Sequence, residues 1–187
     1  MTKDKVCIEF TDGKKINLEL FREYAPESVE NFMALVKDGF YDGLCFHREV
    51  ANSGFYDGVI FHRVIPGFMI QGGGFTQSGG ELIHKPAPRT IRGEFAANGV
   101  RNPLRHTPGV VSMARTPDPN SASSQFFICV EELPYLDGQY AAFGQTADEE
   151  SLKNAIAISE VKTGFAAGGY RDVPVEPVVI KSISVIE

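Results

Sequence analysis

Alternating apolar and polar residues at the start of the chain predict a β-hairpin. Val6, Ile8 and Phe10 alternate with polar residues, and the alternation resumes at Ile16 after an Asp-Gly turn at 12–13. Successive side chains of a strand point to opposite faces, so this pattern describes two strands that share one buried face. The Asp-Gly pair is typical of the tight turn that joins such strands.

Two later segments have the period of a helix. The first begins near Pro26 and ends before Gly39, with Val29 and Phe32 on one apolar face. A second, weaker helical pattern covers residues 148–159. Proline suits the first turn of a helix and glycine suits the position after its end, so the bounds of the first helix are the better defined.

The remaining chain consists of short apolar runs separated by turn residues. The sequence contains 19 glycines and 11 prolines, and it closes with an alternating strand over residues 178–186. Many short strands with two isolated helices indicate a mainly β fold, an antiparallel β-barrel capped by two α-helices. The length of 187 residues favours one domain spanning 1–187.

Charge and hydropathy narrow the range of partners. The chain has 18 basic and 24 acidic residues, a net charge of −6, which disfavours generic binding to nucleic acids. No apolar run approaches the roughly 20 residues that cross a bilayer, and the first residues lack the apolar stretch of a secretion signal. We therefore expect a cytoplasmic protein with no nucleic-acid or membrane partner.

Cysteines and histidines give no sign of a metal site. The three cysteines, at positions 7, 45 and 129, are far apart and form no C-x-x-C pair, so we expect buried or half-buried reduced thiols. None of the four histidines has a partner at metal-ligand spacing, and we expect buried, hydrogen-bonded side chains; they are His47, His62, His84 and His106. No metal or organic cofactor is implied.

One short segment occurs twice. The sequence GFYDGLCFHR at 39–48 recurs as GFYDGVIFHR at 54–63, with eight of ten positions identical. Two units are too few for a solenoid, so this is a local tandem duplication, of natural or engineered origin. We expect residues 39–53 to form an added loop or hairpin, and exposed Phe40, Tyr41 and Phe46 to offer a contact surface. In a competing hypothesis, either copy can occupy the same strand of the barrel, so that in a second register residues 54–63 are looped out.

The segment FHRVIPGFMIQGGGF at 61–75 mixes a strand pattern, a turn, polar side chains and a glycine triplet. Glycines at 74 and 79 have the spacing of a phosphate-binding loop, but Gly80 and Glu81 stand where that loop needs lysine and serine or threonine. Nucleotide binding is therefore disfavoured. A hydrolase remains a weak alternative, because no G-x-S-x-G or cysteine signature is present.

FHRVIPGFMIQGGG, together with HTPGVVSMA at 106–114, SSQFFI at 123–128 and LDGQYAAFG at 136–144, resembles the cyclophilin family of peptidyl-prolyl cis/trans isomerases in its bacterial style. The resemblance runs from about Lys5 to the end of the chain, apart from the repeat. It implies an eight-stranded closed antiparallel β-barrel capped by two helices, with a peptide groove on its outer surface. It also implies isomerisation of Xaa-Pro bonds in peptides and unfolded proteins, without a cofactor.

The resemblance assigns roles to particular residues. Arg63 matches the essential catalytic arginine. The implied apolar pocket for the proline ring consists of Phe68, Met69, Phe127 and Leu136, and the implied hydrogen-bonding glutamines are Gln71 and Gln125. The segment expected to pair with the substrate through its main chain is Ala114, Arg115 and Thr116, and the residues at the pocket rim are Tyr135 and Tyr140. Of these, Arg115 replaces the commoner asparagine in a segment whose contact is through the main chain.

Spacing decides which copy of the repeat carries the catalytic arginine. Arg63 lies five residues before Phe68, whereas Arg48 lies twenty before it. The strand also continues with apolar residues after Arg63 but with Glu49 after Arg48, which would place a carboxylate where an apolar side chain is wanted. The second copy is therefore expected to form the active-site strand.

Two departures from the family pattern concern the pocket rim. Tyr135 stands where many members carry tryptophan, and Tyr140 stands where they carry histidine, so we expect weak cyclosporin binding with catalysis retained. The first hypothesis is an active isomerase that assists protein folding as a monomer. The second is a proline-peptide binding module or scaffold with impaired turnover, and a third is a designed test of fold tolerance.

Overall fold

The computed structural model describes residues 4–38 and 59–187. Within these residues the chain is mainly β, with two α-helices and two short 3-10 turns. The elements in chain order are β1 (Asp4–Phe10), β2 (Lys15–Leu20), α1 (Pro26–Lys37), β3 (Val59–Ile65), β4 (Met69–Ser78), β5 (Glu81–His84), η2 (Ala96–Asn98), β6 (Val110–Met113), β7 (Phe126–Cys129), η3 (Pro134–Leu136), β8 (Ala142–Thr146), α2 (Glu149–Ser159), β9 (Thr163–Ala166), β10 (Tyr170–Pro174) and β11 (Ile180–Ile186). The duplicated segment at 39–53, and the loop, contact surface and copy exchange predicted for it, lie outside the described residues.

The N-terminal hairpin agrees with its alternating pattern. β1 and β2 pair antiparallel with Ile8 opposite Ile16, and both side chains are fully buried. In the turn, the Asp12 carboxylate accepts a hydrogen bond from the Lys14 N–H at 3.0 Å, and Gly13 has a φ of +88° that favours glycine. The apolar side chains of the hairpin therefore face one interior.

The first helix begins with help from a distant residue. Pro26 occupies the first turn, and Ala25 before it has no side chain that could cap the helix. The buried carboxylate of Glu94 accepts hydrogen bonds from the N–H of Glu27 at 2.9 Å and from the N–H and hydroxyl of Ser28 at 2.8 and 2.6 Å. A carboxylate at this end satisfies free N–H groups and is favoured by the helix dipole, so Glu94 acts as the cap.

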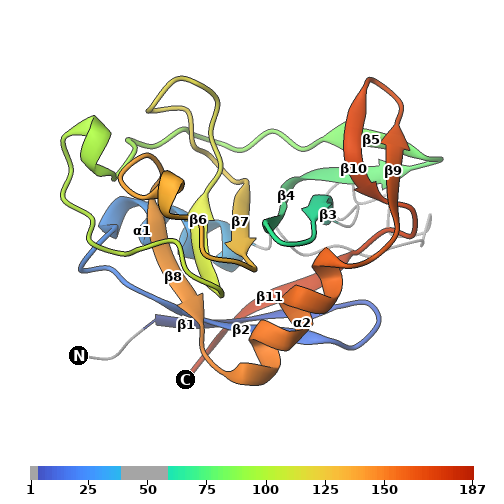
Figure 1. The fold of residues 1–187 in the computed structure, drawn as a ribbon, viewed down its shortest axis with the longest axis horizontal. Coiled ribbons are helices and arrows are strands. Elements are labelled where there is room, and N and C mark those ends of the chain that lie inside the picture. Colours follow the sequence, from blue (N-terminus) through green and yellow to red (C-terminus); the bar gives the residue numbers. More distant parts are fainter. Residues whose placement is uncertain (1–3, 39–58) are drawn as a thin grey trace.

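The strands form a curled antiparallel sheet that is open, and the prediction of a closed barrel is wrong. Eight strands run in the order β11-β1-β2-β8-β6-β7-β4-β3, with β5 paired to β4 outside this path. Among the described residues, β3 and β11 form no ladder; β3 is joined to the residues just before β11 by an isolated bridge between Ile60 and Val179 and by one bond from the Phe61 N–H to the Val178 carbonyl, 2.9 Å. The separate β9–β10 hairpin packs against β3 (Figure 1).

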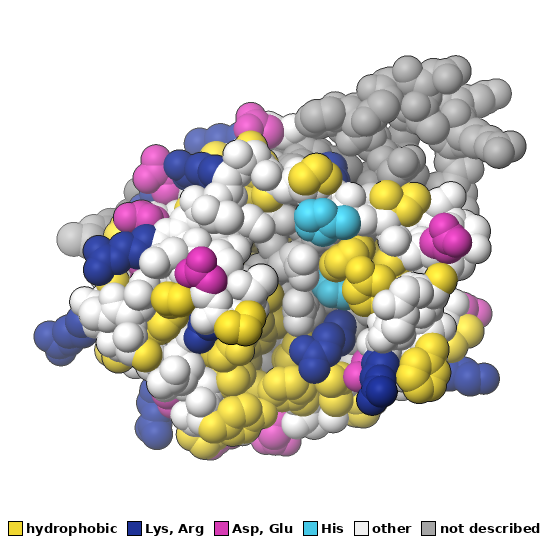
Figure 2. Space-filling model, turned by 90° about the horizontal axis from the view of Figure 1, so that it is seen from above, with side chains coloured by type: hydrophobic (Ala, Val, Ile, Leu, Met, Phe, Trp, Pro, Cys, Tyr) yellow, Lys and Arg dark blue, Asp and Glu magenta, His cyan; other side chains and the backbone are white. Residues whose placement is uncertain are grey.

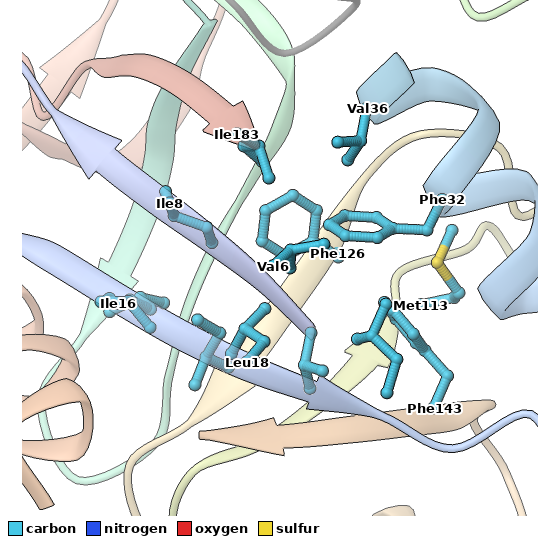
Figure 3. Packing of buried hydrophobic residues seen from close by; sticks show 14 of the residues in the cluster. Val6, Ile8, Ile16, Leu18, Phe32, Val36, Met113, Phe126, Phe143 and Ile183 are labelled. Carbon is cyan, nitrogen blue, oxygen red and sulfur yellow. The ribbon is translucent and has the colours of Figure 1, made fainter. Parts of the chain in front are cut away.

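The interior of the curled sheet holds the main apolar core. Phe32 of α1 lies 5.4 Å from Phe126 in an edge-to-face contact and 5.4 Å from Phe143, so this helix covers the interior on one side (Figure 3). On β4 and β7 the alternation places the side chains of Ile70 and Phe126 in the core. The apolar residues next to them along each strand face the other way and form a second apolar cluster with Leu133 and Leu136. That second cluster is the base of the candidate site.

Histidine environments differ from the prediction at two positions. His106 is buried and hydrogen-bonded as expected. His62 is buried, but its Nδ1 has no hydrogen-bond partner among the described residues, and His84 is exposed at the end of β5. Both lie against the Phe75 ring, with centroids at 4.5 and 5.5 Å, so aromatic packing replaces hydrogen bonding there.

The thiols that the structure describes agree with the prediction, because Cys7 is half-buried and Cys129 is buried, both as free thiols.

Among the described residues no helix has the length and apolar content that crossing a bilayer requires. On the face drawn in Figure 2, hydrophobic side chains gather near the middle beside histidine, and most acidic side chains lie toward the edges.

Candidate active site

Four neighbouring strands carry a row of side chains outside the curled sheet. Arg63 of β3 stands opposite Gln71 of β4, Gln71 opposite Phe127 of β7, and Phe127 opposite Ser112 of β6. Side chains directly across an antiparallel pair share one face of the sheet. The alternation that fills the core with Ile70 thus brings a guanidinium, an amide and an aromatic ring together on the opposite face.

Three residues of this row, Arg63, Gln71 and Phe127, line a surface hollow of about 200 Å³. The hollow contains most of the residues that the family resemblance selected, and its lining consists of Arg63, Phe68, Met69, Gln71, Ala114, Arg115, Phe127, Leu136 and Tyr140. Three of the selected residues lie outside the lining: Thr116, Gln125 and Tyr135. The hollow joins segments from four separate parts of the sequence, and six of its nine lining residues have apolar or aromatic side chains.

Gln125 supports the hollow from behind Gln71. The amide of Gln71 donates a hydrogen bond from Nε2 to Oε1 of Gln125 at 3.1 Å, which orients both side chains. A Cβ atom at Gly74 would collide with the Gln125 side chain, and Gly73 next to it has a φ of +91°. A side chain at Gly74 would therefore displace Gln125, and the φ of Gly73 favours glycine.

The other two residues outside the lining have different environments. Tyr135 is 64% exposed, and its ring stacks on Phe68 with centroids 6.4 Å apart. Thr116 belongs to an exposed turn, where its N–H and its hydroxyl both donate to the Ser121 hydroxyl at 2.9 and 2.8 Å. Tyr135 thus extends the apolar rim beyond the hollow, and the Thr116 N–H is already used within the chain.

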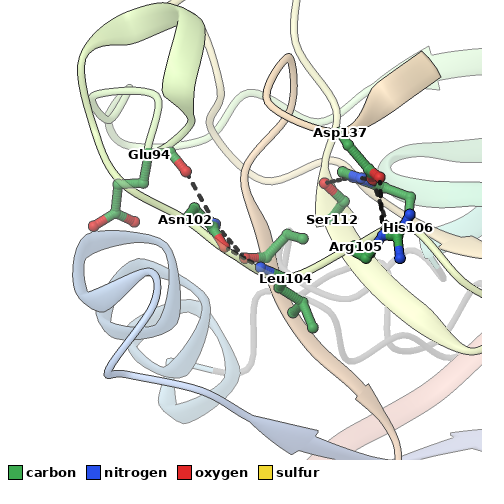
Figure 4. A network of polar contacts seen from close by, with 8 residues as sticks. Glu94, Asn102, Leu104, Arg105, His106, Ser112 and Asp137 are labelled. Atoms are coloured by element: carbon green, nitrogen blue, oxygen red, sulfur yellow. Dashed lines mark hydrogen bonds and ion pairs between the residues drawn. The ribbon is translucent and has the colours of Figure 1, made fainter. Parts of the chain in front are cut away.

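A polar network centred on buried His106 packs against Phe127 of the hollow, and its hydrogen bonds are drawn in Figure 4. The His106 ring stacks on Phe127 with centroids 6.0 Å apart; its Nδ1 lies 2.9 Å from Asp137 Oδ1 and its Nε2 lies 3.0 Å from the Ser112 hydroxyl. Burial lowers the pKa of His106, while the hydrogen bond and charge of Asp137 oppose that shift. The network fixes the ring against which Phe127 packs.

These three residues have the connectivity of a Ser-His-Asp hydrolytic triad, but they do not offer a nucleophile. Ser112 is fully buried in β6, so a substrate carbonyl has no access to its hydroxyl. The network was not expected from the sequence, because Asp137 follows His106 by 31 residues and only the fold brings them together. Its one sequence signal was that His106 and Asp137 both fall in segments that carry the family resemblance.

The hollow is cationic although the chain is acidic. Arg63 is exposed, and its guanidinium has no ion pair or hydrogen bond with any described residue. Arg115 is the other charged lining residue, and none of the lining residues is acidic. Within the described part of the chain, no three histidine, cysteine or acidic side chains gather where they would hold a metal. The site therefore presents hydrogen-bond donors beside apolar surface.

Comparison with known proteins places these features in one family. The family model described as "Cyclophilin type peptidyl-prolyl cis-trans isomerase/CLD" matches residues 5–53 and 48–185. A peptidyl-prolyl cis-trans isomerase of Streptomyces antibioticus is 42% identical over 184 residues, covering 94% of this chain and 95% of its own. Peptidyl-prolyl cis-trans isomerase A of Dickeya dadantii is 42% identical over 182 residues, covering 95% of this chain and 82% of its own.

Solved structures agree with the sequence comparison. A crystal structure of a Cryptosporidium parvum cyclophilin-type peptidyl-prolyl cis-trans isomerase has a TM-score of 0.71 and 29% identity, and the match covers 100% of this chain and 99% of that one. A crystal structure of the same protein in the presence of the dipeptide Ala-Pro has a TM-score of 0.69 and 30% identity, with 98% and 99% covered. The similarity extends over the whole fold described above.

Proposed function

The chain belongs to the family of cyclophilin-type peptidyl-prolyl cis-trans isomerases, and we propose that it rotates Xaa-Pro bonds in the hollow beside Arg63. The observation that carries this assignment is the Arg63 guanidinium, which no described residue pairs and which stands opposite Gln71 at the edge of an apolar pocket. A proline ring fits apolar surroundings, and a guanidinium at the pocket edge can donate to the peptide that carries the ring. The Cryptosporidium relative crystallised with Ala-Pro supports the same substrate class.

The chemistry needs no bond to break. Resonance gives the peptide bond a rotation barrier of about 18–20 kcal/mol, and Xaa-Pro bonds exchange in tens to hundreds of seconds. At the twisted transition state the prolyl nitrogen regains its lone pair. A guanidinium that donates a hydrogen bond to that nitrogen therefore binds the twisted state more tightly than either planar isomer. We propose Arg63 as this donor, because arginine stays charged and holds its donors in a planar fork.

Magnitudes show that the arginine acts together with the pocket. Cutting a process of about 100 s to about 10 ms requires about 5.5 kcal/mol. One charge-assisted hydrogen bond supplies about 1.5–3 kcal/mol of this. The remainder is assigned to the apolar pocket formed by Phe68, Met69, Phe127 and Leu136, which holds the ring while the preceding residue turns.

We propose that the main chain of Arg115 pairs with the extended substrate. In the segment 114–116 the Ala114 N–H already donates to the Gln125 carbonyl at 3.0 Å, and the Thr116 N–H donates to the Ser121 hydroxyl. Arg115 between them is the residue of this segment whose main-chain N–H has no partner among the described residues. Such pairing aligns the substrate without demanding a particular side chain, which suits a broad range of residues before proline.

The further proposals concern properties outside the reaction. We propose one domain over residues 1–187, a cytoplasmic monomer, and weak cyclosporin binding. The last rests on Tyr135, whose exposed ring on Phe68 provides less apolar area than tryptophan and lacks an indole N–H. The alternative of a proline-peptide binding module with impaired turnover shares the same pocket and differs only in the rate of exchange.

The deciding experiment measures cis-trans exchange and binding of a short Ala-Pro peptide side by side. We expect Arg63→Ala to lower kcat/KM by about 10- to 150-fold, the value of one charge-assisted hydrogen bond. Arg48→Ala changes the equivalent residue of the first repeat copy and is the matched control, with native activity expected. Binding without acceleration by the native protein would establish the binding module, and loss of activity in Arg48→Ala alone would reverse the choice of copy.

A further inference from the structure

The side chain of Arg115 connects both rims of the hollow. Its Nε and Nη2 donate to the Gln139 carbonyl at 3.2 and 2.7 Å, and its Nη1 donates to the Thr116 carbonyl at 2.9 Å. One rim is the segment 114–116 and the other is the loop that carries Tyr140. The guanidinium therefore joins two segments that are 24 residues apart in sequence.

The same guanidinium lies over two aromatic rings. Its Cζ is 4.7 Å from the centroid of Tyr140 and 4.9 Å from that of Phe95. Both distances are well inside the range of about 6 Å for cation–π attraction. Phe95 is 2% exposed and belongs to the main core, so it gives the arginine a fixed support.

Tyr140 carries this contact into the pocket. Its ring meets Phe127 edge to face, with centroids 5.7 Å apart and an interplanar angle of 86°. Both rings line the hollow. A continuous series of contacts thus runs from core residue Phe95 through Arg115 and Tyr140 to Phe127 on the pocket floor.

Resting on the proposed function, we infer that the Arg115 side chain is a positioning residue that holds Tyr140 against Phe127 and so shapes the pocket for the proline ring before substrate arrives. A preformed pocket binds more tightly because less side-chain freedom is lost on binding. The arginine acts through Tyr140, whereas the proposed donor in the reaction is Arg63. Its removal therefore weakens peptide binding and leaves turnover of the bound peptide close to native.

The test compares Arg115→Ala and Arg115→Lys with the native protein. We expect Arg115→Ala to raise the Kd for an Ala-Pro peptide and the KM by about tenfold, from the combined loss of ring stacking and preorganisation. The kcat should stay within about a factor of two. Lysine keeps the charge but loses the planar fork, so Arg115→Lys should bind nearly as weakly as Arg115→Ala.

Two readouts separate positioning from general destabilisation. The NMR signals of the Tyr140 ring should shift in Arg115→Ala, and added guanidinium ion at low concentration should partly restore both those signals and the Kd. Arg171→Ala is the matched control, because Arg171 lies over the Phe165 ring at 6.0 Å on the β9–β10 hairpin, away from the hollow. It should leave Kd, KM and kcat unchanged.

Several results would overturn the inference. An unchanged Kd in Arg115→Ala, or a fall in kcat at native KM, would show that the side chain does not position the pocket. If Arg115→Ala fails to fold, a native Kd in Arg115→Lys would overturn it equally. Kd is measured by titration, so it tests the role of Arg115 whether or not the native protein accelerates exchange. A native protein that does not accelerate exchange would refute the proposed function, which is a separate result.

Discussion

Acid should destabilise this protein through His62. The side chain is 6% exposed, its Nδ1 has no described partner, and its ring packs 4.5 Å from Phe75. Burial, and next the positive charge of Arg63, lower the pKa of His62 from 6.5 to about 4. The folded protein therefore keeps this imidazole neutral under conditions where the unfolded chain has already taken up a proton.

The direction and size of the effect follow from that difference. Above about pH 6.5 both states hold the imidazole neutral and His62 gives no pH dependence. As the pH falls from 6.5 toward 4, the unfolded state gains a proton that the folded state does not, and stability is lost. At 1.36 kcal/mol per pH unit, the full loss approaches about 3 kcal/mol.

Urea unfolding at pH 7.5 and pH 4.5 measures this loss. His62→Leu should lose about 2–3 kcal/mol less than the native protein between the two conditions, because leucine takes up no proton. His84→Gln is the matched control, since His84 lies on the same Phe75 ring but is exposed, and its loss should equal the native one. Other acid-sensitive groups are common to all three proteins and cancel in the comparison. An equal loss in His62→Leu and the native protein would refute the argument.

Three further predictions concern the helix cap, the glycine triplet and the charge of the hollow. Glu94→Gln should lower the free energy of unfolding in urea by about 2–3 kcal/mol, because it removes a buried charge-assisted cap, whereas Glu27→Gln in the same helical turn should cost under about 1 kcal/mol. Gly74→Ala should lower kcat/KM by about five- to tenfold by displacing Gln125, and an unchanged value would contradict the close approach. Peptides with Glu beside Xaa-Pro should have a lower KM than those with Lys at low salt, and the difference should shrink as salt rises; no difference would mean that the two lining guanidinium groups are fully screened.

Local patterns in the sequence predict local structure well here. Alternation around Ile8 and Ile16 describes a real hairpin, and the helix expected from Pro26 begins at that residue. The family motifs also select residues that the sheet brings together, because Arg63 and Gln71 stand opposite each other across β3 and β4. Period-two strands fix which side chains share a face, so motifs on neighbouring strands converge once the register is set.

Features that depend on distant partners could not be predicted in this way. Glu94 caps a helix 66 residues earlier, and nothing near Ala25 in the sequence indicates it. The support of Phe127 by His106, and the clamp made by the Arg115 side chain, likewise arise only from the topology. The open edge between β3 and β11 had no sequence signal, because it depends on how the two ends of the strand order come together in space.

That open edge has a consequence for how the fold tolerates a change in chain length. A one-residue slip turns every side chain of a strand to the other face, so a change of length is least harmful beside a strand with few ladder partners. Among the residues that the structure describes, β3 forms a ladder with β4 alone, whereas β7 is paired with β4 and β6 on its two sides. The repeat ends within β3, at Arg63, and its first copy precedes this strand in the sequence. Whether the repeat is natural or engineered, fifteen extra residues before β3 leave one ladder whose register must be kept, the one that places Arg63 opposite Gln71.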